Sequence, residues 1–140
     1  MTHRLLVPVD GSPQAQNALT YALETFPDAH IVVAHVLTPA DSGVNPDGLV
    51  GDVSSIVDAQ TRLAEELFAK AKSRAGDGRT VDTELLAGRP AREIVRYAED
   101  NEIDQVIMGS HGRDGAARLL LGSVSETVVR RSPVPVTVVR

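Results

Sequence analysis

The sequence predicts an α/β fold in which a parallel sheet of five strands is covered by helices on both faces. Two observations carry this prediction: short apolar runs recur along the chain, and segments with helical spacing of apolar residues alternate strictly with them. The 140 residues are about one domain's worth, and 42% apolar residues is close to the ordinary globular mix. We therefore expect residues 1–140 to form a single domain with three layers.

The first strand and the helix that follows it establish the alternation. A buried strand is expected over Leu5–Val9, with Pro8 near its end because proline cannot donate to a strand ladder. Ser12 and Pro13 form a typical helix start, since serine caps a helix and proline is tolerated in its first turn. The remaining elements are expected in this order: the first helix continuing to Phe26 before Pro27-Asp28, a strand over Ile31–Leu37, a helix from Ile56 to Ala71 that ends by Gly76, a strand over Thr80–Leu86, a helix from Pro90 through Ala98, a strand over Gln105–Met108, a helix from Ser123 through Val128, and a strand over Val134–Val139.

Three local features refine this pattern. Val81, Thr83 and Leu85 alternate with polar neighbours, which predicts a strand of edge-like character. Ser123 is expected to cap the last helix. The residues from Thr38 to about Ser54 include several prolines and glycines and few large apolar side chains, so a long loop is expected there, and long loops in small domains are often functional.

Composition and charge exclude several classes of protein. With 19 acidic against 14 basic residues the net charge is −5, which disfavours broad binding to nucleic acid. Cysteine is absent, so disulfides and thiolate metal sites are excluded. No apolar run approaches the roughly 18 residues that a membrane span needs, and the first residues lack the layout of a signal peptide. We therefore expect a cytoplasmic protein that binds neither nucleic acid nor membranes.

The segment from Gly109 to Ser123 is the strongest candidate for a binding site. It has glycines at 109, 112 and 122, and it connects a buried strand to a helix. Glycine lets backbone N–H groups approach an anion, and a helix N-terminus adds unpaired donors and the positive end of a dipole. Ser110, Ser123 and Ser125 add hydroxyl groups, so a phosphate cradle is predicted. The alternative is a loop whose glycines serve only its turns.

Two common phosphate-binding motifs do not fit this segment. The P-loop requires a lysine after its last glycine, and no lysine lies near. The dinucleotide motif of three glycines follows the first strand of its fold, whereas the first strand here leads into Asp10-Gly11-Ser12. From the residues alone, Asp10 is either a ligand group at a strand end or a cap of the helix behind it.

The chain resembles the universal stress proteins of the small, single-domain, nucleotide-binding type. The resemblance covers essentially the whole chain, and the spacing Gly109-x2-Gly112-x9-Gly122-Ser123 matches the ATP-binding signature of that family. The other matching segments are the opening strand and turn Leu6 to Ser12, the strand end His35-Val36, the turn Gly88-Arg89-Pro90-Ala91 and the closing Ser132 to Val139.

The resemblance implies a Rossmann-like fold of the adenine nucleotide alpha hydrolase type, with strand order 3-2-1-4-5. It implies ATP, or ADP or AMP, as the cofactor, with any Mg²⁺ held by the phosphates. Asp10 would lie beside the adenosine, the backbone of Val36 would read the adenine edge, and Gly112, Gly122 and Ser123 would hold the phosphates. The full set of nucleotide-binding residues expected is Pro8, Val9, Asp10, Val36, Met108, Gly109, Ser110, Gly112, Arg113, Gly122, Ser123, Val124 and Ser125.

The resemblance also implies a homodimer formed through the last strand, Val134–Val139, which would be an aggregation liability as a bare edge. Other protein partners cannot be named from the sequence. No nucleophile paired with a base is evident, no metal-ligand cluster has the right spacing, and His111 is the one candidate base. A regulatory, nucleotide-binding module of the stress response is therefore expected. The alternatives are a slow ATPase or phosphoryl-transfer enzyme, and an interaction scaffold with a vestigial pocket.

Overall fold

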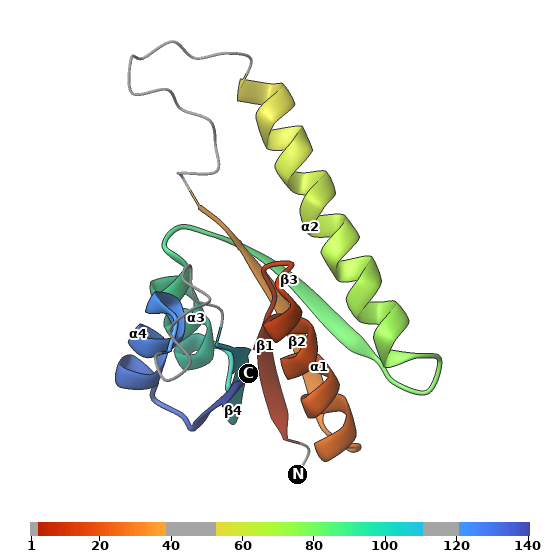
Figure 1. Cartoon of the computed structure of the whole chain (residues 1–140), viewed down its shortest axis with the longest axis vertical. Coiled ribbons are helices and arrows are strands. Elements are labelled where there is room, and N and C mark those ends of the chain that lie inside the picture. The colour runs from red at the N-terminus through yellow and green to blue at the C-terminus, as the bar shows by residue number, and fades with distance from the viewer. Residues whose placement is uncertain (1–2, 39–52, 111–120) are drawn as a thin grey trace.

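Five parallel strands form one sheet in the order β3-β2-β1-β4-β5, which confirms the predicted order (Figure 1). The structure is a computed structural model that describes residues 3–38, 53–110 and 121–140. Its elements alternate as expected from the sequence. Their bounds are β1 Arg4–Pro8, α1 Pro13–Thr25, β2 His30–Leu37, α2 Val53–Ala75, β3 Val81–Ala87, α3 Pro90–Asp100, β4 Gln105–Gly109, α4 Ser123–Arg131 and β5 Val136–Val139.

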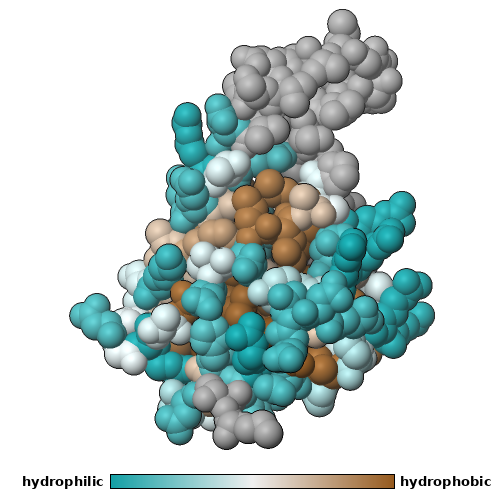
Figure 2. Space-filling view, turned by 180° about the vertical axis from the view of Figure 1, so that it is seen from behind, coloured by the Kyte–Doolittle hydropathy of each residue, from teal (hydrophilic) through white to brown (hydrophobic). Residues whose placement is uncertain are grey.

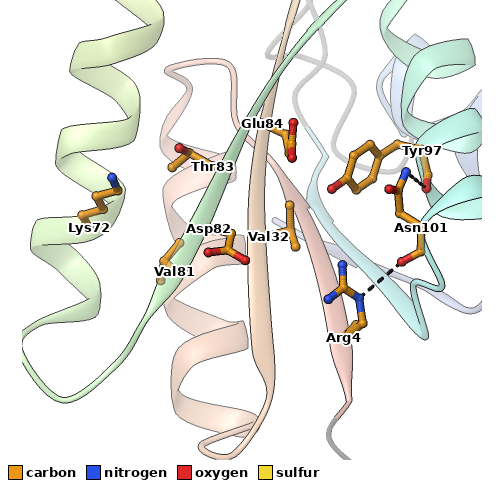
Figure 3. Close-up of a pocket in the computed structure, with 9 residues that line it drawn as sticks. All are labelled: Arg4, Val32, Lys72, Val81, Asp82, Thr83, Glu84, Tyr97 and Asn101. Atoms are coloured by element: carbon orange, nitrogen blue, oxygen red, sulfur yellow. Dashed lines mark hydrogen bonds between the residues drawn. The ribbon is translucent and has the colours of Figure 1, made fainter.

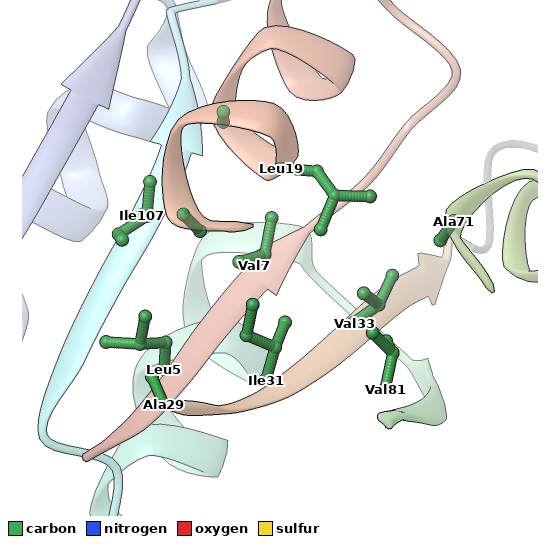
Figure 4. Packing of buried hydrophobic residues seen from close by; sticks show 11 residues of the cluster. Leu5, Val7, Leu19, Ala29, Ile31, Val33, Ala71, Val81 and Ile107 are labelled. Atoms are coloured by element: carbon green, nitrogen blue, oxygen red, sulfur yellow. The ribbon is translucent and has the colours of Figure 1, made fainter. Parts of the chain in front are cut away.

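Two apolar layers hold the helices on the sheet. Successive side chains of a strand point to opposite faces, so Leu5 and Val7 pack under α1 and α2 while Leu6, between them, packs under α3 and α4. All three are 0% exposed. Figure 4 shows the first of these layers, in which strand side chains lie against Leu19 of α1 and Ala71 of α2. A strand buried on both faces explains why β1 reads as an unbroken apolar run.

The start of α1 is fixed by two side chains in sequence. The Ser12 hydroxyl accepts a hydrogen bond from the backbone N–H of Ala15 at 3.2 Å, as predicted for a cap. The Ser12 N–H in turn donates to Asp10 Oδ1 at 2.9 Å. Asp10 therefore stabilises the turn that precedes the helix, and Ser12 is the residue that caps it.

Replacing Ser12 by alanine is expected to lower the free energy of unfolding by about 1 kcal/mol. The reason is that Ser12 is only 7% exposed, so the Ala15 N–H would lose its acceptor where water reaches poorly. Urea unfolding of the two proteins measures the difference. Ser12→Asp keeps an acceptor at this position and is the matched control. Equal loss in both variants would contradict the capping role.

The structure corrects four details of the sequence prediction. Gly122, and not Ser123, is the cap residue of α4, and no side chain makes the cap hydrogen bond. The helix α2 begins at Val53, earlier than the expected Ile56. Strand β5 begins at Val136, two residues after Val134, because the Ser132 hydroxyl binds both the N–H and the carbonyl of Val134 in a turn. Of the expected loop from Thr38 to Ser54, residues 39–52 lie outside the described part of the chain.

The fourth correction concerns the edge strand. β3 is indeed at an edge, but Leu85 is 42% exposed although its alternation with polar residues predicted an inward position. Leu86 packs instead, against the layer under α3 and α4. An edge strand has a neighbour on one side only, so alternation predicts its burial less well than it does for a central strand.

Candidate functional site

The carboxyl edge of the sheet brings together the elements that the sequence analysis singled out. β1 and β4 are neighbours, and from them the chain order runs outward in opposite directions, to β2 and β3 on one side and to β5 on the other. Such a switch point is where open α/β sheets bind ligands, outside the carboxyl ends of the strands. Pro8 ends β1 and Gly109 ends β4, while α1 and α4 begin at this edge with their N-termini.

Gly109 is required by close packing between β4 and the start of α1. A Cβ atom placed on Gly109 would lie 2.6 Å from the backbone nitrogen of Ala15 and 2.6 Å from the carbonyl carbon of Gln14. Real Cβ contacts are not this short, and backbone atoms in a helix cannot move away independently. The glycine therefore lets the N-terminal turn of α1 lie directly against the end of β4.

The turn after β1 presents a carboxylate at this edge. Asp10 is exposed, and Gly11 takes a positive φ of 85°, a conformation that favours glycine. Leu67 of α2 covers this turn, since a Cβ on Gly11 would meet its Cδ2 at 3.6 Å. Of the two roles considered for Asp10, the helix cap belongs to Ser12, and the Asp10 side chain remains accessible.

The end of β2 lies beside this turn and supplies apolar surface. Val36 is 8% exposed and packs in the layer under α3 and α4. His35 Nδ1 lies 2.7 Å from the carbonyl oxygen of Val9, and because a carbonyl only accepts, Nδ1 carries the proton. His35 thus joins the ends of β2 and β1 by a hydrogen bond. Figure 2 shows hydrophobic side chains gathered on the face seen from behind.

The two serines at the start of α4, Ser123 and Ser125, differ in their exposure to solvent. Ser123 is exposed at the first position of the helix. Ser125 is 1% exposed and its hydroxyl donates to the Gly122 carbonyl at 3.0 Å, so it stabilises the helix start from within. Val124, between them, is half-buried against the core.

The remaining expected site residues fall into two groups. Met108 is 4% exposed, Val9 is half-buried, and Ser110 donates its N–H to the Val139 carbonyl at 2.9 Å. Gly112, Arg113 and His111 lie outside the described residues, so the centre of the predicted phosphate cradle stays a prediction. The described residues do bring Pro8, Asp10, Gly109 and Gly122 to one edge of the sheet.

Sequence reasoning missed Gln14. Its Oε1 is buried without a hydrogen-bond partner among the described residues, and its Cβ lies beside Gly109. A buried amide oxygen without a donor is costly, so Gln14 is an unsatisfied polar group at this edge of the sheet. Its position two residues after the Ser12 cap was the available signal, because that turn of the helix faces the carboxyl edge.

The same described ranges contain no cluster of metal ligands and no membrane-spanning helix. No group of three or more His, Asp or Glu side chains there is placed to hold a metal ion. None of the helices in those ranges has both the length and the apolar character needed to cross a membrane.

Comparison with known sequences gives consistent matches over the full chain. A sequence model of the universal stress protein family matches residues 1–140. The universal stress protein MJ0531 of Methanocaldococcus jannaschii is 32% identical, over 98% of this chain and 81% of its own length. The universal stress protein MJ0577 of the same organism is 31% identical, over 100% of this chain and 96% of its own length.

Solved structures share the fold. The structure of MJ0577, determined to assign a biochemical function, has a TM-score of 0.82 and 30% identity, covering 99% of this chain and 96% of that one. A universal stress protein in complex with cAMP has a TM-score of 0.67 and 23% identity, with coverage of 99% and 97%. One from Archaeoglobus fulgidus in complex with dAMP has a TM-score of 0.66 and 20% identity, with coverage of 100% and 98%.

Proposed function

The chain belongs to the universal stress protein family, and from this premise we propose that it binds an adenine nucleotide at the carboxyl edge of its sheet. The observation that carries the proposal is the junction at Gly109, where the end of β4 meets the N-terminus of α1 beside the exposed Asp10. Two proteins of the same fold were solved with cAMP and with dAMP, which supports an adenine nucleotide as the ligand class.

The proposed contacts follow the order of the ligand's parts. Asp10 binds the adenosine, and the backbone of Val36 contacts the edge of the adenine. Met108 and Gly109 line the approach to the ribose and phosphates. Backbone N–H groups at the start of α4 bind the phosphates, because a helix N-terminus favours an anion. The other residues of the proposed site are Pro8, Val9, Ser110, Gly112, Arg113, Gly122, Ser123, Val124 and Ser125.

We propose ATP as the main ligand and a regulatory role in the stress response as the outcome of binding. Mg²⁺, where present, is bound chiefly by phosphate oxygens, as is usual for this ion in nucleotide sites. The protein residues then act by binding and orienting the nucleotide. In this proposal residues 1–140 act as one cytoplasmic domain, and its surface changes with nucleotide occupancy so that a protein partner distinguishes the two states.

We further propose that two copies pair through β5. The Pro135 carbonyl accepts from Val106 of β4, and the Val139 carbonyl accepts from Ser110 just after β4. The alternate residues Val136 and Val138 therefore direct their backbone groups to the open edge. All four residues of β5 are half-buried in the single chain. Pairing with a second β5 would satisfy these backbone groups and cover the valines.

Ser123→Glu is the variant that tests nucleotide binding. Glutamate in the first turn of a helix is compatible with α4, because the helix dipole favours a negative charge there. The same charge repels phosphate, so we expect Mg-ATP affinity to fall at least about tenfold. Thermal unfolding with and without ligand measures this, since ligand at about 100 times its Kd stabilises the wild type by roughly 2.7 kcal/mol.

The matched control is Ser73→Glu, an exposed position on α2 that changes the net charge equally. We expect it to keep the ligand-induced stabilisation of the wild type. Nucleotide carried through purification is removed by denaturation and refolding before the measurement. Equal stabilisation of both variants by Mg-ATP would place the nucleotide elsewhere, and no stabilisation of refolded wild type would refute nucleotide binding.

A further inference from the structure

A hollow of about 480 Å³ lies at the amino edge of the sheet, beside the edge strand β3 (Figure 3). Its lining comes from the start of β1, the first half of β3 and the end of α3. The nucleotide site proposed above is at the opposite ends of these strands, so the two sites are independent. This volume falls within the roughly 300–1,000 Å³ that is usual for pockets that bind small molecules.

Opposite charges face this hollow from two sides. Arg4 reaches it from β1, while Asp82 and Glu84, two residues apart on β3, reach it from one face of that strand. In Figure 3 the side chains of Arg4, Asp82 and Glu84 lie around Val32. Among the ion pairs of the described residues, none joins Arg4 to either carboxylate.

Two of these three charged groups, Arg4 and Asp82, are positioned by a neighbouring residue. Arg4 Nε donates to the Asn101 carbonyl at 3.3 Å, and the Asn101 side chain donates to the Tyr97 carbonyl at 3.0 Å. Asp82 Oδ2 lies 2.7 Å from His30 Nε2, and the negative charge of Glu84 raises the pKa of the nearby Tyr97 hydroxyl. Groups that are already positioned lose less conformational freedom when a ligand binds.

Tyr97 shows that these charges act on one common space. Burial raises the pKa of its hydroxyl, the negative charge of Glu84 raises it further and Arg4 lowers it, with a smaller increase from Asp82. A phenol feels both carboxylates and the guanidinium only where all three are near it. Lys72, the other cation of the lining, lies across β3 on α2 (Figure 3).

We propose that this hollow binds a small zwitterion, with its carboxylate on Arg4 and its ammonium between Asp82 and Glu84. A guanidinium binds a carboxylate through parallel hydrogen bonds, and an ammonium offers three donors to carboxylates. Because the cation and the anions of the protein lie on opposite sides of the hollow, one molecule needs both charges to pair with both sides. A free amino acid is the simplest ligand of this kind.

The test is an NMR titration of the ¹⁵N-labelled protein with glycine, β-alanine and 4-aminobutyrate, whose charges are progressively farther apart. We expect one of them to give saturable shifts at the amides of Thr83, Glu84, Tyr97 and Asn101, with a Kd in the millimolar range because the site is open to water. Methylammonium and acetate, each with one charge, are expected to bind at least about tenfold more weakly.

Two variants and one control locate the binding. Arg4→Gln and Glu84→Gln each remove one charge with little change in size, and we expect each to weaken the best zwitterion about tenfold. Arg96→Gln, an exposed arginine of α3 paired with Asp100, is expected to change nothing. The proposal is overturned if no zwitterion saturates up to about 100 mM, if the single-charge compounds bind as well, or if the shifts map to other residues.

Discussion

Gly109→Ala is expected to destabilise the protein by about 3 kcal/mol, the upper range for overpacking a well-packed site. The added methyl group would lie 2.6 Å from two backbone atoms in the first turn of α1. Those atoms belong to a helix whose buried residues pack on β1 and β4, so the helix cannot move away without losing core contacts. Urea unfolding at neutral pH measures the effect.

Gly78→Ala is the matched control for this prediction. Nothing lies within 4 Å of a Cβ placed on Gly78, and its φ is not in the positive region. We expect a change within about 0.5 kcal/mol, because the substitution creates no clash. If Gly109→Ala proved as mild as Gly78→Ala, the close approach of α1 to β4 would not exist as described.

Arg79→Met is expected to lower the free energy of unfolding by a similar amount, about 3 kcal/mol. The Arg79 guanidinium donates to the carbonyls of Leu23, Phe26 and Ala29 at 2.9, 3.0 and 3.0 Å. These carbonyls lie at the end of α1 and in the turn to β2. The last turn of α1 contains no basic residue that could donate hydrogen bonds to them. Methionine keeps much of the aliphatic stem and removes all the donors.

Arg74→Met tests whether any arginine between α2 and α1 has this effect. Arg74 donates to Thr20 Oγ1 and Gln16 Oε1, but these bonds are exposed, so water replaces them readily. We expect a loss of at most about 1 kcal/mol, measured by the same urea unfolding. A loss equal to that of Arg79→Met would mean that the three carbonyls do not depend on Arg79.

The alternation of apolar runs and amphipathic segments was sufficient to predict the nine elements of the described residues, because both patterns are local. The order of the strands is not local, and it came from the resemblance to a family. Boundaries were less accurate where a polar side chain decides the turn, as Ser132 does before β5. The alternation in β3 suggested that the Leu85 side chain is buried, but Leu85 is 42% exposed. Alternation does not show how much of an edge strand is buried by neighbouring elements.

The candidate site, too, could be predicted from the sequence only in part. Glycine at 109 was predicted as part of a phosphate cradle, but its packing against Ala15 depends on residues 94 positions away in the chain. The three hydrogen bonds of Arg79 likewise join segments that lie far apart in the chain. No spacing rule contains them, since only the folded chain brings these residues together.

The chemical difference between the two edges of the sheet limits how far copies can assemble. Strand β5 presents Val136 to Val139, whereas β3 carries Asp82 and Glu84 along its edge. In the proposed pairing the two β5 edges cover each other by a twofold axis, and a β3 strand becomes each outer edge. A third copy would then have to bring carboxylates against carboxylates, which are repulsive when directly opposite. In the proposed pairing the assembly would therefore be a closed pair, protected from growing into a fibre.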